Sequence, residues 1–286
     1  MVALPARQRE NTMSRLSLTS LTSVFIVILQ AGVGKSQTVE DLIQKNLGAR
    51  GGLERLKAVQ TVRMTGTMVN DQMEGALILK FKRPNSSRIE LTVQGMTAIQ
   101  AFDGRVSWIL GPEETDARLE SGYDLKERQN ADFDGALVDY KEKGSKVELA
   151  GKDEVDGIES YRLRVTLKNG DVQFIHLDSE RFIEIKIERR EKEVEAEYLV
   201  GDYREVGGIL YAHTLERGIR GKPEKERILI DRIELNVPID DAEFKTPRPR
   251  KRVPRPDDPL PPVTSPSNHS IGAIKAMVKS IVASDR

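Results

Sequence analysis

The segment Tyr161-Arg-Leu-Arg-Val-Thr-Leu167, followed by Lys168-Asn-Gly170, decides the fold class of this chain. Apolar and polar side chains alternate through it, and a period of two residues is typical of a β-strand with one buried face. Asn-Gly favours a tight hairpin turn, because both positions of that turn require positive φ. The segment therefore predicts a strand that turns directly into an antiparallel neighbour.

The same period of two extends along most of the chain. Asp103-Gly104, a second favourable hairpin dipeptide, separates two alternating runs upstream. In Ile183-Glu-Ile-Lys-Ile187, the isoleucines are predicted to face away from the charged residues. In the last run, alternation predicts that Ile230 and Arg232 share one face and that Ile233 lies on the other. Between them, Glu188-Arg-Arg-Glu-Lys-Glu193 mixes charges of both signs and is interpreted as a solvated hairpin.

Helical patterns occur in two places among these strands. Thr38 is a candidate N-cap for an apolar stripe that ends at Gly51-Gly52. Residues 113–143 are mixed in polarity and predict one or two helices with loops. A sheet of so many strands must curl, and its inner face must be covered. The expected fold is α+β: a strongly curved antiparallel sheet, an unclosed half-barrel, with helices over its concave face.

The two ends of the chain differ from its middle. Met13-Ser-Arg15, the apolar run Val24–Leu29 and small residues through Ser36 predict a secretory signal peptide, and the true start is Met1 or Met13. The apolar run is shorter than the roughly 20 residues that span a bilayer. We therefore assign residues 1–36 to a signal peptide, 37–247 to the folded domain, and 248–286 to a Pro-rich basic tail with a short C-terminal amphipathic helix.

Composition excludes several functional classes. The chain has 45 basic and 45 acidic residues, so no net charge attracts nucleic acid. The absence of cysteine excludes disulfides, thiolate metal sites and a lipid-modified N-terminal cysteine, so the mature protein is expected to be soluble. Gly32-Val-Gly-Lys-Ser36 is similar to the end of a phosphate-binding loop, but Leu29 stands where the first glycine of that loop belongs.

The residue pattern predicts no active site. The three histidines, His176, His213 and His269, share no helical spacing. Asp240-Asp241 lies at a strand exit, where aspartate favours turns and caps. We therefore expect a non-catalytic protein with no cofactor and no metal. Two alternatives remain open: a metal held by His176 and His213, and a hydrolase that uses one of them.

Three stretches carry a resemblance to a known family: Ala49-Arg-Gly-Gly52 after an N-terminal helix, the run Tyr161–Ile187, and Ile233–Phe244. Together they resemble the outer-membrane lipoprotein-sorting proteins of the LolA/LolB-like superfamily, in a divergent branch, over residues 38–247. The resemblance implies an unclosed barrel capped by helices, with an apolar cavity that shields acyl chains in the periplasm of the bacterial cell envelope. The insertion at 113–143 and the tail beyond Phe244 depart from the short carriers of that family.

The expected function is a periplasmic carrier or binder of the acyl chain of a lipoprotein or lipid. Such a protein needs an apolar sheath, because each methylene of a chain in water costs about 0.8 kcal/mol. We expect a monomer whose basic tail contacts a membrane surface or an acidic partner. The alternative is an envelope structural or protein-interaction module whose interior is filled by side chains. Alternation selects eight candidates for the cavity lining: Leu77, Leu79, Phe81, Ile89, Leu91, Trp108, Leu163 and Val165.

Overall fold

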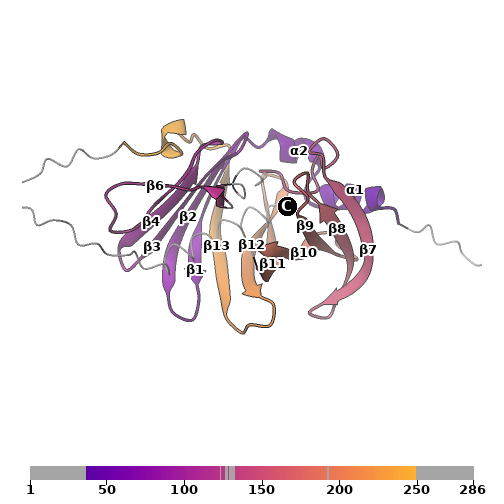
Figure 1. The fold of residues 1–286 in the computed structure, drawn as a ribbon. Coiled ribbons are helices and arrows are strands. Elements are labelled where there is room, and N and C mark those ends of the chain that lie inside the picture. Colours follow the sequence, from indigo (N-terminus) through magenta and orange to yellow (C-terminus); the bar gives the residue numbers. More distant parts are fainter. Residues whose placement is uncertain (1–36, 123, 126–127, 129–132, 192, 249–286) are drawn as a thin grey trace, which may run out of the picture. The chain divides into compact units, whose positions relative to one another are not determined.

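The computed structural model describes residues 37–122, 124–125, 128, 133–191 and 193–248. Within them, thirteen strands form one antiparallel sheet that is strongly curved and unclosed, accompanied by few helices (Figure 1). The predicted signal peptide and most of the predicted tail lie outside the described residues.

The chain enters this sheet through two helices. The helix α1 (Val39–Ala49) begins at Thr38, whose hydroxyl accepts the N–H of Asp41 at 3.1 Å while the Asp41 carboxylate accepts the N–H of Thr38 at 3.2 Å. This reciprocal pair is a capping box, which fixes the helix start. The helix ends before Gly51, where φ is +119° and an added Cβ would lie 2.2 Å from the carbonyl oxygen of Gly208. The short helix α2 (Leu53–Ala58) follows.

The strands follow one another along the sheet except at its centre. Their order is β6-β5-β4-β3-β2-β1-β13-β12-β11-β10-β9-β8-β7, so the first strand pairs with the last, and β6 and β7 are the two edges. The bounds are β1 (Thr61–Val69), β2 (Glu74–Lys82), β3 (Ser86–Val93), β4 (Met96–Phe102), β5 (Ser107–Leu110), β6 (Arg118–Leu119), β7 (Lys146–Val155), β8 (Ile158–Thr166), β9 (Val172–Asp178), β10 (Glu184–Glu191), β11 (Val194–Val206), β12 (Ile209–Ile219) and β13 (Lys225–Leu235), followed by the 3₁₀ turn η1 (Asp241–Glu243).

One face of this sheet, which we call the inner face, is apolar across both halves. In one half, Leu79 is paired with Met64 and with Ile89. In the other half, Ile175 is paired with Leu163 and with Ile187. Directly paired residues in an antiparallel ladder point to the same side of the sheet. These residues, together with Leu42, Ile43, Leu47 and Leu56 of the helices, belong to a single buried apolar cluster.

A β-bulge corrects the facing predicted for the last strand. The register between β1 and β13 shifts at Gly66, so that Asp231 is an extra residue without a partner in β1. Ile230 pairs with Gly66 and Ile233 with Met64, which places both isoleucines on the inner face. The prediction that Ile233 lies opposite Ile230 is therefore wrong, because a bulge resets strict alternation by one residue.

A second register shift corrects the facing predicted at the start of β10. Glu184 pairs with Leu177 on the inner face, whereas Lys186 pairs with His176 on the other face, which we call the outer face. Ile185 is the inserted residue between the two pairs. Glu184 is therefore not on the same side as Lys186, although simple alternation places them together.

Among its described residues, the middle segment contains a strand as well as helical positions. It contains the two-residue edge strand β6, and of its other described residues 122, 124–125 and 128 are helical. Ala136, Leu137 and Val138 are buried and join the same apolar cluster as the strands. The segment therefore contributes a strand and core residues in addition to helical turns.

Candidate ligand-binding face and a buried ion-pair network

Seven of the eight predicted lining residues lie on the inner face. The ladder of paired residues runs through Leu77 with Leu91, Leu79 with Ile89, and on to Leu163 and Val165 in the other half. All eight candidates are buried, none more than 6% exposed. The structure therefore brings seven of them together on one continuous apolar surface. Whether that surface holds a ligand stays a prediction.

Trp108 lies on the outer face instead. It pairs with Ala101, whereas its neighbour Ile109 pairs with Gln100 on the inner face. The indole Nε1 donates a hydrogen bond to the carbonyl oxygen of Phe244 at 2.8 Å, and both groups are buried. Trp108 thus anchors the segment after β13 against the outside of the sheet, and the structure separates it from the other seven candidates.

A surface pocket of about 870 Å³ opens between the end of α2 and the segment after β13. None of the eight predicted residues lines it. Its lining is Ala58, Gln60, Thr61, Lys82, Asn236, Val237, Pro238, Ile239, Asp240 and Glu243. The Asp240 carboxylate accepts the N–H of Ala242 at 2.9 Å, and Asp241 pairs with Lys82 at 2.5 Å. The acidic pair therefore caps η1 and fixes this segment, which agrees with the turn role predicted for it.

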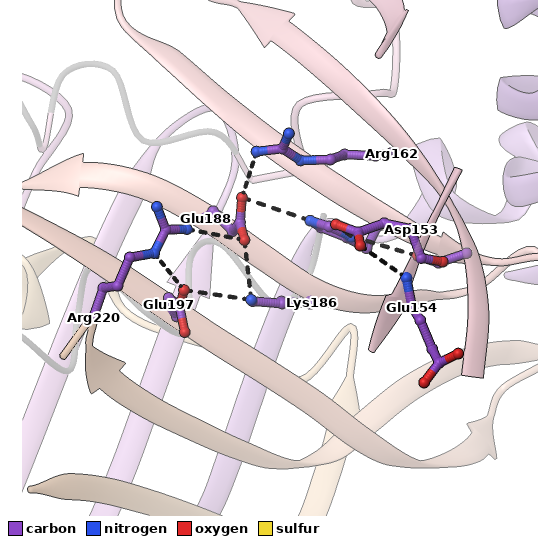
Figure 2. A network of polar contacts seen from close by, with 9 residues as sticks. Asp153, Glu154, Arg162, Lys186, Glu188, Glu197 and Arg220 are labelled. Carbon is purple, nitrogen blue, oxygen red and sulfur yellow. Dashed lines mark hydrogen bonds and ion pairs between the residues drawn. The ribbon is translucent and has the colours of Figure 1, made fainter. Parts of the chain in front are cut away.

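The outer face carries a charged network centred on Glu188 and His176, which we call the outer network (Figure 2). The Glu188 carboxylate contacts Arg162 at 2.8 Å, Lys186 at 3.0 Å and Arg220 at 3.1 Å. Nε2 of the fully buried His176 lies 3.7 Å from the same carboxylate. Contact with His176, followed by that with Lys186 and Arg162, holds the pKa of Glu188 well below its usual range. Glu188 is therefore an anion shared among groups from three strands and the turn after β12.

This network has the atom order of a serine–histidine–acid triad but not its accessibility. The Ser160 hydroxyl lies 3.4 Å from Nδ1 of His176, and Glu188 lies beyond Nε2 of the ring. Ser160 and His176 are each 0% exposed, and the hydroxyl lies 3.2 Å from the backbone carbonyl of Asp153, to which it donates. A substrate carbonyl would need direct approach to the hydroxyl. The arrangement is therefore a buried cross-strand linkage between β8, β9 and β10.

The two histidines described by the structure do not converge. His176 lies on the outer face, whereas His213 lies on the same side of β12 as Leu215, which pairs with Ile228 of the inner face. Nδ1 of His213 is 3.1 Å from the carbonyl oxygen of Tyr211. The alternative of a metal held jointly by His176 and His213 is excluded by this placement. His269 lies outside the described residues.

The run Glu188–Glu193, predicted to be a solvated hairpin, is only partly solvated. Glu188 and Glu191, interpreted as part of a solvated hairpin, are both 6% exposed, while Arg190 and Glu193 are solvated. The interpretation is therefore wrong for Glu188 and Glu191. Their arginine partners come from β8, from β12 and from the turn after it, so the local run alone could not reveal the burial.

Comparisons with known proteins support the fold. No protein-family model matches the chain, and no curated protein matches it. Among solved structures, it is similar to a DUF1329 family protein from Desulfovibrio piger, with a TM-score of 0.52 and 15% identity, over 73% of this chain and 98% of that one. This likeness shows a shared fold.

Two further solved structures carry the family name that the sequence resembles. One is a putative outer membrane lipoprotein-sorting protein domain from Vibrio parahaemolyticus, with a TM-score of 0.49 and 11% identity, over 71% of this chain and 94% of that one. The other is a LolA superfamily protein from Nitrosomonas europaea, also with a TM-score of 0.49 and 11% identity, over 73% and 98% of the two chains.

Proposed function

We propose that the protein is a monomeric, non-catalytic binder or carrier of acyl chains that works in the periplasm after export. The observation that supports this proposal is the continuous apolar inner face of an unclosed, curved sheet. No helix among the described residues is long and apolar enough to span a membrane. The predicted signal peptide at residues 1–36 accounts for export.

The proposed ligand is held between the inner face and the helices. Residues of α1, α2 and the segment Ala136–Val138 share one apolar cluster with the strands, so we propose that these segments cover the concave face. An acyl chain placed there would be protected from water along its length, at a gain of about 0.8 kcal/mol for each buried methylene. Entry requires the covering segments to part from the strands, because the predicted lining residues are buried in the described structure.

Ligand binding tests the proposal directly. Full-length protein purified from a periplasm is expected to carry a lipid that solvent extraction and mass spectrometry identify, and to bind a fluorescent fatty acid that unlabelled lipid displaces. Leu91→Trp, which fills the inner face, is expected to weaken binding at least tenfold. Leu229→Trp on the outer face, where Leu229 is 37% exposed, is the matched control and should bind as wild type. Protein without lipid that also fails to bind the probe would overturn the proposal.

A second candidate function is an envelope structural or protein-interaction module without a ligand cavity. It is favoured by the burial of Leu137 and Val138 in the same cluster as the strand residues, since side chains of the chain itself then occupy the interior. In that case the pocket of about 870 Å³ beside η1 is the concave surface available to a partner. Competition binding separates the two functions, because only the carrier takes up an acyl chain.

We also propose that the tail makes weak contact with an anionic membrane surface. Its basic residues are Arg248, Arg250, Lys251, Arg252 and Arg255, next to Lys245 at the end of the folded domain, and an apolar stripe with Lys275 and Lys279 follows near the end. Each basic residue near an anionic surface gains about 1 kcal/mol, and the gain is screened by salt.

Liposome co-sedimentation tests the tail. Full-length protein is expected to sediment with phosphatidylserine-containing vesicles at low salt and to be released at high salt. A chain that ends after Pro247 should remain in the supernatant under both conditions. Equal sedimentation of the two forms would show that the tail is not responsible.

A further inference from the structure

A second charged cluster, which we call the inner cluster, lies on the apolar inner face. It consists of Arg189 and Glu191 of β10, Tyr198 of β11, Arg217 of β12 and Glu226 of β13. Arg217 is paired across the ladders with Tyr198 and with Glu226, and Tyr198 is paired in turn with Ile187 of the apolar cluster. The five side chains therefore point to the same side of the sheet as the proposed acyl-chain surface.

The members of the inner cluster are closely connected. Arg217 Nη2 lies 2.8 Å from the Glu191 carboxylate, and Arg189 Nε lies 3.2 Å from it. The Tyr198 hydroxyl donates to Glu191 and lies 3.1 Å from Arg189 Nη2. Arg217 Nη1 lies 3.5 Å from Glu226. Two guanidinium groups thus converge on one buried carboxylate and one phenol.

The inner cluster lies at the hairpin ends of its strands. Glu191 is the last residue of β10, Glu226 is the second residue of β13, and Arg217 is close to the end of β12. Next along the same face come the apolar pairs of Leu215 with Val200 and with Ile228. The inner face therefore has charged groups at one end of the strands and an apolar surface beyond them. This arrangement matches an amphiphile, which has a charged headgroup at one end of an apolar chain. The side chains of Arg189 and Arg217 are each 13% exposed, so solvent reaches both.

The inner cluster presents two guanidinium groups beside a neutral phenol. Burial is the main cause that raises the pKa of Glu226, and burial likewise raises the pKa of Tyr198 to about 12, so the phenol stays neutral. The guanidinium groups of Arg189 and Arg217 are the positively charged groups of the cluster, and both are partly exposed to solvent. A buried ion-pair group is often no more stable than apolar residues of similar volume, so its presence on an apolar face calls for a role other than stability.

We propose that the inner cluster binds the anionic headgroup, a carboxylate or a phosphate monoester, of an amphiphile whose acyl chain lies along the inner face. The inference rests on the proposed acyl-chain binding and specifies which ligands are preferred. The planar fork of a guanidinium matches two oxygens of either headgroup, and such charge-assisted pairs are stronger than neutral ones. Arg189 and Arg217 contact the headgroup, and the neutral phenol of Tyr198 lies beside it.

Competition with three ligands of equal chain length tests this inference on the full-length protein. Palmitic acid, monopalmitoylglycerol and its phosphate monoester displace a bound fluorescent acyl probe. Wild type is expected to bind at least one of the two anionic ligands tenfold or more tightly than the uncharged glyceride. The headgroup that is preferred identifies the ligand class.

Two arginine variants locate that preference. Arg217→Gln and Arg189→Gln are expected to lose most of it while they bind the uncharged glyceride within twofold of wild type. Arg227→Gln is the matched control, because Arg227 lies on the outer face, pairs with Glu216 and is 59% exposed. Circular dichroism checks that each variant is folded. If a variant is not folded, the affinities of wild type for the charged and uncharged ligands still test the inference.

The outcomes separate this inference from the function on which it rests. Equal affinity of wild type for charged and uncharged ligands would overturn headgroup recognition while acyl-chain binding stands. An anionic preference that survives in both arginine variants would also overturn it. Failure of all three ligands to displace or bind would overturn the proposed function itself.

Discussion

Glu188→Gln is expected to lower the free energy of unfolding by about 3 kcal/mol, because it removes the buried carboxylate that several partly buried cations share. Arg162, Lys186 and Arg220 all contact the Glu188 carboxylate within 3.1 Å, and His176 lies beside it. The amide has nearly the shape of the carboxylate, so the change removes charge with little effect on packing. Urea denaturation at neutral pH measures the loss.

Glu159→Gln is the control for this change. Glu159 pairs with Lys152 at 3.0 Å but is well exposed, and exposed ion pairs contribute little to stability. No measurable shift of the urea midpoint is expected for this variant. Equal effects of the two substitutions would contradict the importance assigned to the outer network.

The same carboxylate makes the protein sensitive to acid. Because the pKa of Glu188 is lower in the folded state than in the unfolded chain, its contribution is present above the unfolded value and is lost as pH falls below it. Wild type is therefore expected to lose stability from about pH 5 downward, the range in which ordinary glutamates become protonated. The difference between wild type and Glu188→Gln should shrink over the same range. A difference that stays constant down to pH 3 would contradict this reading.

Gly66→Ala is expected to destabilise the protein by about 3 kcal/mol, at the upper end of what overpacking in a core costs. An added Cβ would lie 2.0 Å from the carbonyl oxygen of Leu229 and 3.0 Å from Cα of Ile230. Both are backbone atoms of the central strand β13, so neither can move without breaking the ladder at the bulge. Thermal and urea unfolding measure the change.

Gly48→Ala is the matched control in α1. An added Cβ at Gly48 meets nothing within 4 Å, so the alanine is expected to stabilise the helix by about 0.5–1 kcal/mol. Opposite signs for the two glycine changes are the expected result. A tolerated Gly66→Ala would contradict the shifted register between β1 and β13.

Local patterns predicted the elements of this fold more successfully than their pairing. The Thr38 cap, the Asn169-Gly170 turn and the alternation around Leu163 depend on neighbours in the chain, and each appears in the structure as expected. The bulge at Asp231 depends on the register of a strand more than 150 residues away, so alternation alone could not reveal it.

Trp108 shows why the candidate site was only partly predictable. Alternation correctly groups Trp108 with Leu110, but it cannot tell which side of β5 is the inner one. Both sides are buried at Trp108, since the segment that contains Phe244 packs on the outer face. Predictions of facing depend on a contrast between a buried and an exposed side of a strand. That contrast is absent where both sides of the strand are buried.

The pairing of the first strand with the last also sets an order of assembly. Val62 pairs with Leu235, so the centre of the sheet closes only when both ends of the domain are available. Before that, the chain can form hairpins from β1 to β6 and from β7 to β12, each of which leaves the edge that later joins them exposed. The apolar core is therefore completed only when β13, which begins at Lys225, joins the two halves of the sheet.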